Sequence, residues 1–290
     1  MAATEGTSLK GVGPQSRYVK IQGREMHYTE WGSPGARPVM MWHGLARTGR
    51  DFDFLARKLA DRFHIVCPDT IGRGLSEWSD KPDSDYCFDV YARHAAELAD
   101  VLGWKTLDWV GTSMGGSLGM RVGATTLAGR IRRLVINDIG PTFPVEPFER
   151  IKTYVGSPSE FSTMGELITY FQTIYAPFGH HTDAQWRHFA ETSMRRLPSG
   201  KVTAHYDPAI VRQLFSFPND FELWDCWDRI TAPTLVLHGE SSDLLLPAIA
   251  ADMARRGPKA QVVDITGCGH APALNVTSQT AIVAQFLDAA

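Results

Sequence analysis

The sequence is poor in cysteine and has no long apolar run. Its 290 residues include only four cysteines, and no two of them stand at C-x-x-C spacing. A chain of this length does not need disulfides for stability, so we expect free thiols and a cytoplasmic protein. No apolar stretch approaches the roughly 18 residues of a membrane-spanning helix. Residues 1–15 predict a loose arm and lack the basic and apolar regions of a signal peptide, so we expect no membrane association.

An excess of charge of one sign is also missing. Lys and Arg number 29 against 32 Asp and Glu, which gives a net charge of −3 and no basic stripe of the kind that binds nucleic acid. The sequence has no P-loop, no complete G-x-G-x-x-G and no H-E-x-x-H, so we expect neither a nucleotide cofactor nor a metal. The composition is that of an ordinary globular protein, with 43% hydrophobic residues. We expect its partner to be a small molecule.

Short apolar runs alternate with amphipathic segments along most of the chain. A predicted hairpin, 17–21 and 25–30, comes first. Strands are then predicted at 38–42, 64–67, 107–110 and 133–137, and helices at 51–63, 90–102 and 114–127. This alternation predicts a mostly parallel central sheet with helices on both faces, an α/β fold.

The alternation stops after residue 140 and resumes near residue 231. Between them we expect helical pieces around 166–175, 183–196 and 208–215. Beyond them we expect a strand at 234–237, a helix at 247–256, a strand at 261–265 and a helix at 279–287. The sequence therefore predicts one core, residues 1–140 and 231–290, with a helical cap at 141–230 inserted after the sixth strand.

A candidate nucleophile, Ser113, stands in the segment Gly111-Thr112-Ser113-Met114-Gly115, between a predicted strand and a predicted helix. G-x-S-x-G in this context is the pattern of a nucleophile elbow, in which a sharp turn needs very small residues on both sides of the serine. The alternative is a plain strand–helix turn with an incidental serine.

A serine hydroxyl needs a base, and the base needs an acid to orient it. His270 follows the last predicted strand in a glycine-rich loop and is the candidate base. Asp243 is the favoured acid, because Ser113, Asp243 and His270 then follow the chain order typical of this pattern. Asp138, directly after another predicted strand, is the rival acid, and Glu240 is a weaker one.

Two backbone N–H groups are predicted to stabilise an oxyanion, those of Leu45 and Met114. Leu45 follows the strand at 38–42, and Gly44 allows a close turn there. His43 is interpreted as a structural hydrogen-bonding residue rather than as a second base.

These residues resemble the α/β-hydrolase fold superfamily, in its capped, serine-nucleophile branch. The resemblance covers nearly the whole chain and rests on His43-Gly44, on residues 69–76, on the turn at Ser113, on Asp243 and on Gly269-His270. It implies a helical cap, and it implies that residues 69–76 form a structural turn beside the site.

The resemblance implies hydrolysis of a carboxylic ester through an acyl-enzyme on Ser113. A small to medium or hydroxyalkanoate acyl group is expected. A C–C bond hydrolase of meta-cleavage-type diketo acids, an enol-lactonase and, more remotely, a ligand receptor remain alternatives. Arg47, Phe143 and Trp186 are the candidate substrate-binding residues. Each has an ordinary alternative as a surface charge or as packing within the cap.

Overall fold

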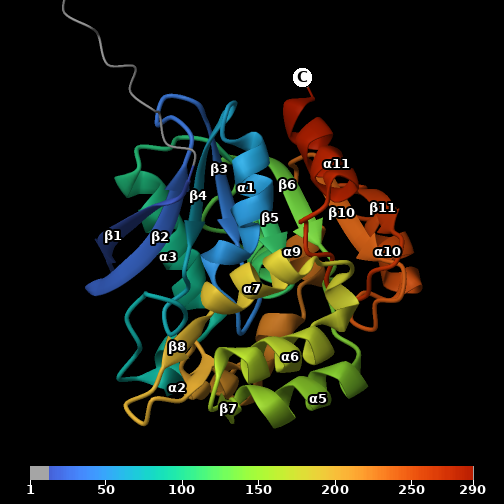
Figure 1. Ribbon diagram of the computed structural model, residues 1–290. Coiled ribbons are helices and arrows are strands. Elements are labelled where there is room, and N and C mark those ends of the chain that lie inside the picture. The colour runs from blue at the N-terminus through green and yellow to red at the C-terminus, as the bar shows by residue number, and fades with distance from the viewer. Residues whose placement is uncertain (1–12, 290) are drawn as a thin grey trace, which may run out of the picture.

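A computed structural model describes residues 13–289, so residues 1–12 of the arm predicted at residues 1–15 lie outside the described residues, and Gln15 already belongs to the first strand. An eight-stranded sheet has the order β1-β2-β4-β3-β5-β6-β10-β11 (Figure 1). Its strands are β1 (Gln15–Ile21), β2 (Arg24–Trp31), β3 (Arg37–Trp42), β4 (Phe63–Pro68), β5 (Leu107–Thr112), β6 (Ile131–Asn137), β10 (Thr234–Gly239) and β11 (Gln261–Ile265).

The sheet is parallel from β4 to β11, and only the β1–β2 hairpin and the β2–β4 pair are antiparallel. Every residue of β4 and of β10 is buried. Strands of a parallel sheet are covered on both faces, which explains why these segments read as continuous apolar runs rather than as alternating ones. The predicted hairpin and the mostly parallel sheet are confirmed.

Helices pack on both faces of this sheet. One face carries Leu98 of α3 and Leu118 of α4 in a large buried cluster, and the other carries Leu55 of α1 and Val283 of α11 in a second cluster. The helices of this part are η1 (Gly49–Phe52), α1 (Asp53–Leu59), α2 (Pro82–Asp85), α3 (Phe88–Val101), α4 (Met114–Ala124), α10 (Pro247–Met253) and α11 (Thr277–Asp288). None of the helices in residues 13–289 is long and apolar enough to cross a membrane.

The segment between β6 and β10 lies over the carboxyl ends of the strands (Figure 1). It contains α5 (Val145–Val155), β7 (Glu160–Phe161), α6 (Met164–Ile174), η2 (Ala176–Phe178), α7 (Asp183–Glu191), β8 (Met194–Arg196), β9 (Val202–Ala204), η3 (Pro208–Val211), α8 (Arg212–Ser216), η4 (Pro218–Phe221) and α9 (Trp224–Trp227). The segment has its own apolar cluster, which includes Phe171, Trp186 and Phe189. We call it the inserted segment; its division from the core at residues 141 and 230 stays a prediction.

Candidate active site

Ser113 stands on the turn between β5 and α4. Its backbone has φ +52° and ψ −117°, a conformation that residues other than glycine rarely adopt. The Ser113 N–H donates to the Asn137 carbonyl of the neighbouring strand at 3.0 Å. The strained turn therefore places the hydroxyl at the N-terminus of α4, where backbone N–H groups lack helical partners and negative charge is stabilised.

The turn is possible because the residues two before and two after Ser113 have no side chain. A Cβ on Gly115 would lie 1.9 Å from the Trp42 carbonyl oxygen, and one on Gly111 would lie 2.1 Å from the Gly115 carbonyl oxygen. The buried Trp109 donates its indole N–H to that same Gly115 oxygen at 3.0 Å. The start of α4 is thus packed directly against the ends of β3 and β5.

His270, in the loop after β11, lies against the serine. Its Nε2 is 2.8 Å from the Ser113 Oγ, and its Nδ1 is 2.9 Å from an oxygen of Asp138. A carboxylate only accepts hydrogen bonds, so the Nδ1 carries the proton and donates it to Asp138. The Nε2 of the neutral ring is then free to accept the Ser113 proton. The predicted contact between Ser113 and His270 is present.

Asp138, directly after β6, is completely buried. Besides His270, its carboxylate accepts from the Gly239 N–H at 2.6 Å and from the Ser242 hydroxyl at 2.7 Å. A buried charge is tolerated when several hydrogen bonds compensate it. These contacts fix the carboxylate in the position that orients His270.

The prediction that Asp243 orients His270 is wrong. The Asp243 side chain is 46% exposed and accepts a hydrogen bond from Arg150 at 2.5 Å. The loop after β10 turns Ser242 inward, onto Asp138, and leaves Asp243 on the surface. The other rival, Glu240, is also exposed and accepts from the Gly267 N–H.

The loop after β3 reaches the nucleophile. A Cβ on Gly44 would lie 3.7 Å from the Ser113 Cβ. Burial lowers the pKa of His43 to about 4, so this ring is neutral at pH 7. Its Nε2 accepts from the Thr70 N–H at 2.9 Å, and its Nδ1 donates to the Gly44 carbonyl at 2.7 Å. His43 therefore fixes the peptide unit whose nitrogen belongs to Leu45.

A fully buried arginine in the 69–76 turn also holds this loop, and sequence reasoning missed its role. Arg73 donates to the Leu45 carbonyl at 2.9 Å and to the Tyr91 hydroxyl at 2.8 Å. Its other terminal nitrogen lies 3.6 Å from the Met114 sulfur. The signal in the sequence was an arginine between two glycines, but nothing there shows which carbonyl it would reach.

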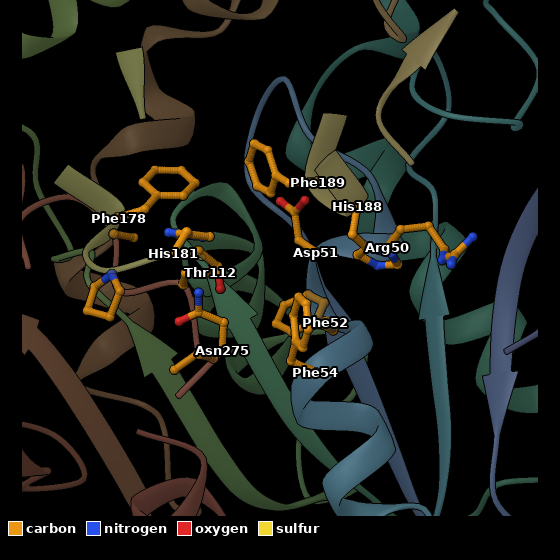
Figure 2. A pocket seen from close by; sticks show the side chains of 14 residues that line it. Arg50, Asp51, Phe52, Phe54, Thr112, Phe178, His181, His188, Phe189 and Asn275 are labelled. Atoms are coloured by element: carbon orange, nitrogen blue, oxygen red, sulfur yellow. The ribbon is translucent and has the colours of Figure 1, made fainter. Parts of the chain in front are cut away.

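A pocket lies beside the Ser113 turn and the His270 loop. Thr112 and Ala271, their immediate sequence neighbours, form part of its wall. Figure 2 shows His181 and Asn275 on one side and Phe52 and Phe54 on the other. The remaining lining residues are Arg50, Asp51, Phe178, His188, Phe189, Pro272, Ala273 and Leu274.

None of the three predicted substrate-binding residues is among those that line this pocket. Arg47 is buried, pairs with Asp51 at 2.6 Å and places its guanidinium 3.6 Å from the centre of the Phe189 ring. Trp186 stacks on His181 with 4.2 Å between ring centres. Phe143 packs on Phe148 and Phe221 in a separate aromatic group. The direct role of these three residues in substrate binding stays a prediction. Through its contact with Phe189, Arg47 links the core to the inserted segment.

Residues 13–289 contain no group of three or more His, Cys, Asp or Glu side chains that could hold a metal ion. The groups that the structure brings together at this site are a serine hydroxyl, an imidazole ring and a buried carboxylate.

Comparisons with known proteins find hydrolases among the relatives of this chain. The chain is 38% identical over 275 residues to a 3-hydroxybutyrate-oligomer hydrolase of Cupriavidus necator, covering 91% of this chain and 93% of that protein. It is 27% identical to a 2-(acetamidomethylene)succinate hydrolase of Mesorhizobium japonicum, covering 81% and 82%. Among solved structures, a putative hydrolase from Rickettsia typhi has a TM-score of 0.86 and 27% identity, covering 94% and 98%.

The family itself is shown by a family model. The model described as "Alpha/beta hydrolase family" matches residues 39–285, most of the chain from β3 to α11. The eight-stranded sheet, its parallel part and the helices on its two faces agree with that match. The chain therefore belongs to the alpha/beta hydrolase family.

Proposed function

We propose that this hydrolase cleaves carboxylic esters with Ser113 as the nucleophile. The observation that carries the proposal is the hydrogen-bonded line from Ser113 Oγ through His270 to Asp138. The relative from Cupriavidus necator, named as a 3-hydroxybutyrate-oligomer hydrolase, supports an ester substrate with a short hydroxyacyl unit. The hydroxyalkanoate ester is therefore the substrate class that we favour.

The reaction follows from the positions of these atoms. Ser113 Oγ attacks the acyl carbon while His270 Nε2 takes its proton, and the Asp138 carboxylate stabilises the imidazolium that forms. Collapse of the tetrahedral intermediate breaks the bond to the alcohol oxygen, which takes the proton from His270. Water then attacks the acyl-enzyme and gives a proton to His270. Collapse of this second intermediate breaks the bond to Ser113 Oγ, which takes the proton back from His270 as the carboxylic acid leaves.

The N–H groups of Leu45 and Met114 are the proposed oxyanion donors. Met114 is the first residue of α4, and the loop that carries Leu45 packs against Ser113 through Gly44. His43 and Arg73 hold the two peptide units on either side of Leu45, so they act as positioning residues. One such donor typically contributes about 2.7–4 kcal/mol to transition-state stabilisation.

The charges around the pocket favour a neutral ester over a diketo acid. A C–C hydrolase of diketo acids needs a cationic group for the substrate carboxylate. Arg47 is paired with Asp51, and Arg50 is paired with Asp53 at 2.6 Å. Figure 2 shows the Arg50 side chain extending away from the other lining residues. We therefore place the C–C hydrolase second.

Ser113 is tested by a fluorophosphonate adduct and by a ladder of p-nitrophenyl esters from acetate to palmitate. We expect the adduct on Ser113, a rate maximum at short acyl chains, and a loss of kcat of at least about 10⁴-fold in Ser113→Ala. Unchanged activity in this variant would reject the proposal.

The chain offers a matched control serine. Ser16 Oγ lies 2.9 Å from His27 Nε2, and His27 Nδ1 lies 2.8 Å from Asp69, so the same three side-chain types are hydrogen-bonded in the same order. Ser16, however, lies within β1, paired with β2, and not at a helix N-terminus. We expect no adduct on Ser16 and wild-type rates in Ser16→Ala.

A further inference from the structure

Most polar side chains that line the pocket beside Ser113 already have partners. Arg50 and His188 both bind the buried Asp53, His188 at 2.8 Å. Asp51 accepts two hydrogen bonds from Arg47. The Arg50 and Asp51 pairs lie within the core, and the His188–Asp53 pair joins the inserted segment to the core. All three groups are therefore occupied and offer little to a ligand.

His181 differs from these residues, because the described residues supply a hydrogen-bond partner for only one of its two ring nitrogens. Its Nδ1 lies 3.0 Å from the Gly179 carbonyl, which can only accept, so this nitrogen carries the proton of the neutral ring. Burial lowers the pKa of His181, which keeps the ring neutral at pH 7. Stacking on Trp186 fixes the ring plane. His181 lines the pocket, and its Nε2, for which residues 13–289 supply no hydrogen-bond partner, is then an oriented acceptor.

Asn275 contributes a second acceptor to the same side of the pocket (Figure 2). Its amide nitrogen donates to the His180 carbonyl at 3.0 Å, which leaves its side-chain oxygen available. Two acceptors, with the Asp51 carboxylate also in the wall, disfavour a carboxylate ligand. They favour a group that donates a hydrogen bond.

The rest of the wall is apolar. Phe52, Phe54, Phe178, Phe189 and Leu274 surround the same space. A ligand that fits must therefore be mostly hydrocarbon and carry one hydrogen-bond donor. A short hydroxyacyl chain has this composition, whereas a plain acyl chain lacks the donor and a dicarboxylic half-ester carries a charge instead.

We propose that this pocket binds the acyl part of the ester through its free hydroxyl, with His181 Nε2 as the acceptor and Asn275 next to it. This inference rests on the proposed function and makes His181 a specificity-determining residue. It implies that an oligomeric hydroxyalkanoate enters with its hydroxyl end in the pocket, so that Ser113 removes units from that end.

The test compares p-nitrophenyl esters of both 3-hydroxybutyrate enantiomers with those of butyrate, 3-fluorobutyrate and succinate. We expect kcat/KM for one 3-hydroxybutyryl enantiomer to exceed that for the butyryl and 3-fluorobutyryl esters by about 10-fold, the effect of one neutral hydrogen bond. His181→Phe should bring this ratio close to one by slowing the hydroxyacyl ester alone. His181→Gln, which retains an acceptor, should restore part of the ratio.

His180→Phe is the matched control, because the neighbouring His180 is exposed and does not line the pocket. It should leave the ratio unchanged. A wild-type ratio of one, a preference for the succinyl ester, or an unchanged ratio in His181→Phe would each overturn the inference. Fluorophosphonate labelling of Ser113 in every variant separates this failure from a failure of the proposed function or of folding.

Discussion

The choice between two aspartates decides how His270 is held. Asp138 and Asp243 both follow strand ends, and β6 and β10 are adjacent in the sheet. The sequence therefore places both carboxylates near the same edge. What separates them is backbone direction: Asp138 has φ +59° and turns inward, where two donors besides His270 reach it.

Replacing each aspartate by its amide separates the two. Asp138→Asn should lower kcat by about 10³–10⁴-fold, because the amide no longer stabilises the imidazolium or selects the required tautomer. Asp243→Asn, which loses only a surface contact with Arg150, should keep kcat within about twofold, since exposed ion pairs contribute little. Steady-state kinetics on one ester, with circular dichroism as a folding check, measures both. A larger loss in Asp243→Asn would refute the assignment.

Local signals made two residues of the site predictable and left others hidden. Ser113 has glycines on both sides and His270 follows a strand end, so the sequence alone predicts both, and the structure brings their side chains into contact. The position of Asp138 depends on hydrogen bonds from Gly239 and Ser242, in a loop about 100 residues away in the sequence. No local sequence pattern reveals these contacts. The acceptor role of His181 depends on a carbonyl and a stacked ring, which no sequence pattern encodes.

The elements of the core were predictable because their apolar periodicity is regular, and those of the inserted segment were less so. The sequence analysis missed α5, which contains Pro147 in its first turn, where proline is tolerated. The helix predicted at 183–196 ends at Glu191, because residues 194–196 pair with β9 in a small three-stranded sheet. Short strands of this kind carry too little pattern to be recognised.

Helix α4 shows how one element can contain two glycines with opposite roles. Gly115→Ala would force a Cβ to within 1.9 Å of the Trp42 carbonyl oxygen, so β3 and α4 would have to separate. We expect a loss of about 1–3 kcal/mol in the free energy of unfolding, typical of overpacking, and a drop in kcat because the loop after β3 carries Leu45.

Gly123→Ala on the same helix is the control. Its Cβ would lie 3.5 Å from Ile131, an ordinary contact, so the substitution should raise the free energy of unfolding by about 0.5–1 kcal/mol and leave kcat unchanged. Urea unfolding and ester kinetics on both variants provide the measurements. Equal stability of the two variants would show that the elbow tolerates a side chain at Gly115.

Across the whole molecule, buried neutral histidines couple stability to pH. Burial lowers the pKa of both His43 and His94 to about 4, against an ordinary value of 6.5. Between these values the unfolded chain binds more protons than the folded one, so stability is complete above pH 6.5 and falls as the pH drops toward 4. His43 belongs to the proposed site, whereas His94 lies in α3, away from the pocket.

His94→Leu isolates this effect. The His94 Nδ1 is buried and has no hydrogen-bond partner among residues 13–289, so a leucine of similar size should change stability at pH 7.5 by less than about 1.5 kcal/mol. Between pH 6.5 and 4.5 the wild type should lose about 2–3 kcal/mol more than the variant, because the variant has no proton to bind at this position on unfolding. Urea titrations at several pH values measure the difference, with the exposed His180→Leu as the control. If the free energy of unfolding changed with pH in the same way in wild type and His94→Leu, His94 would be protonated in the folded state. That result would reject the prediction of a neutral buried ring.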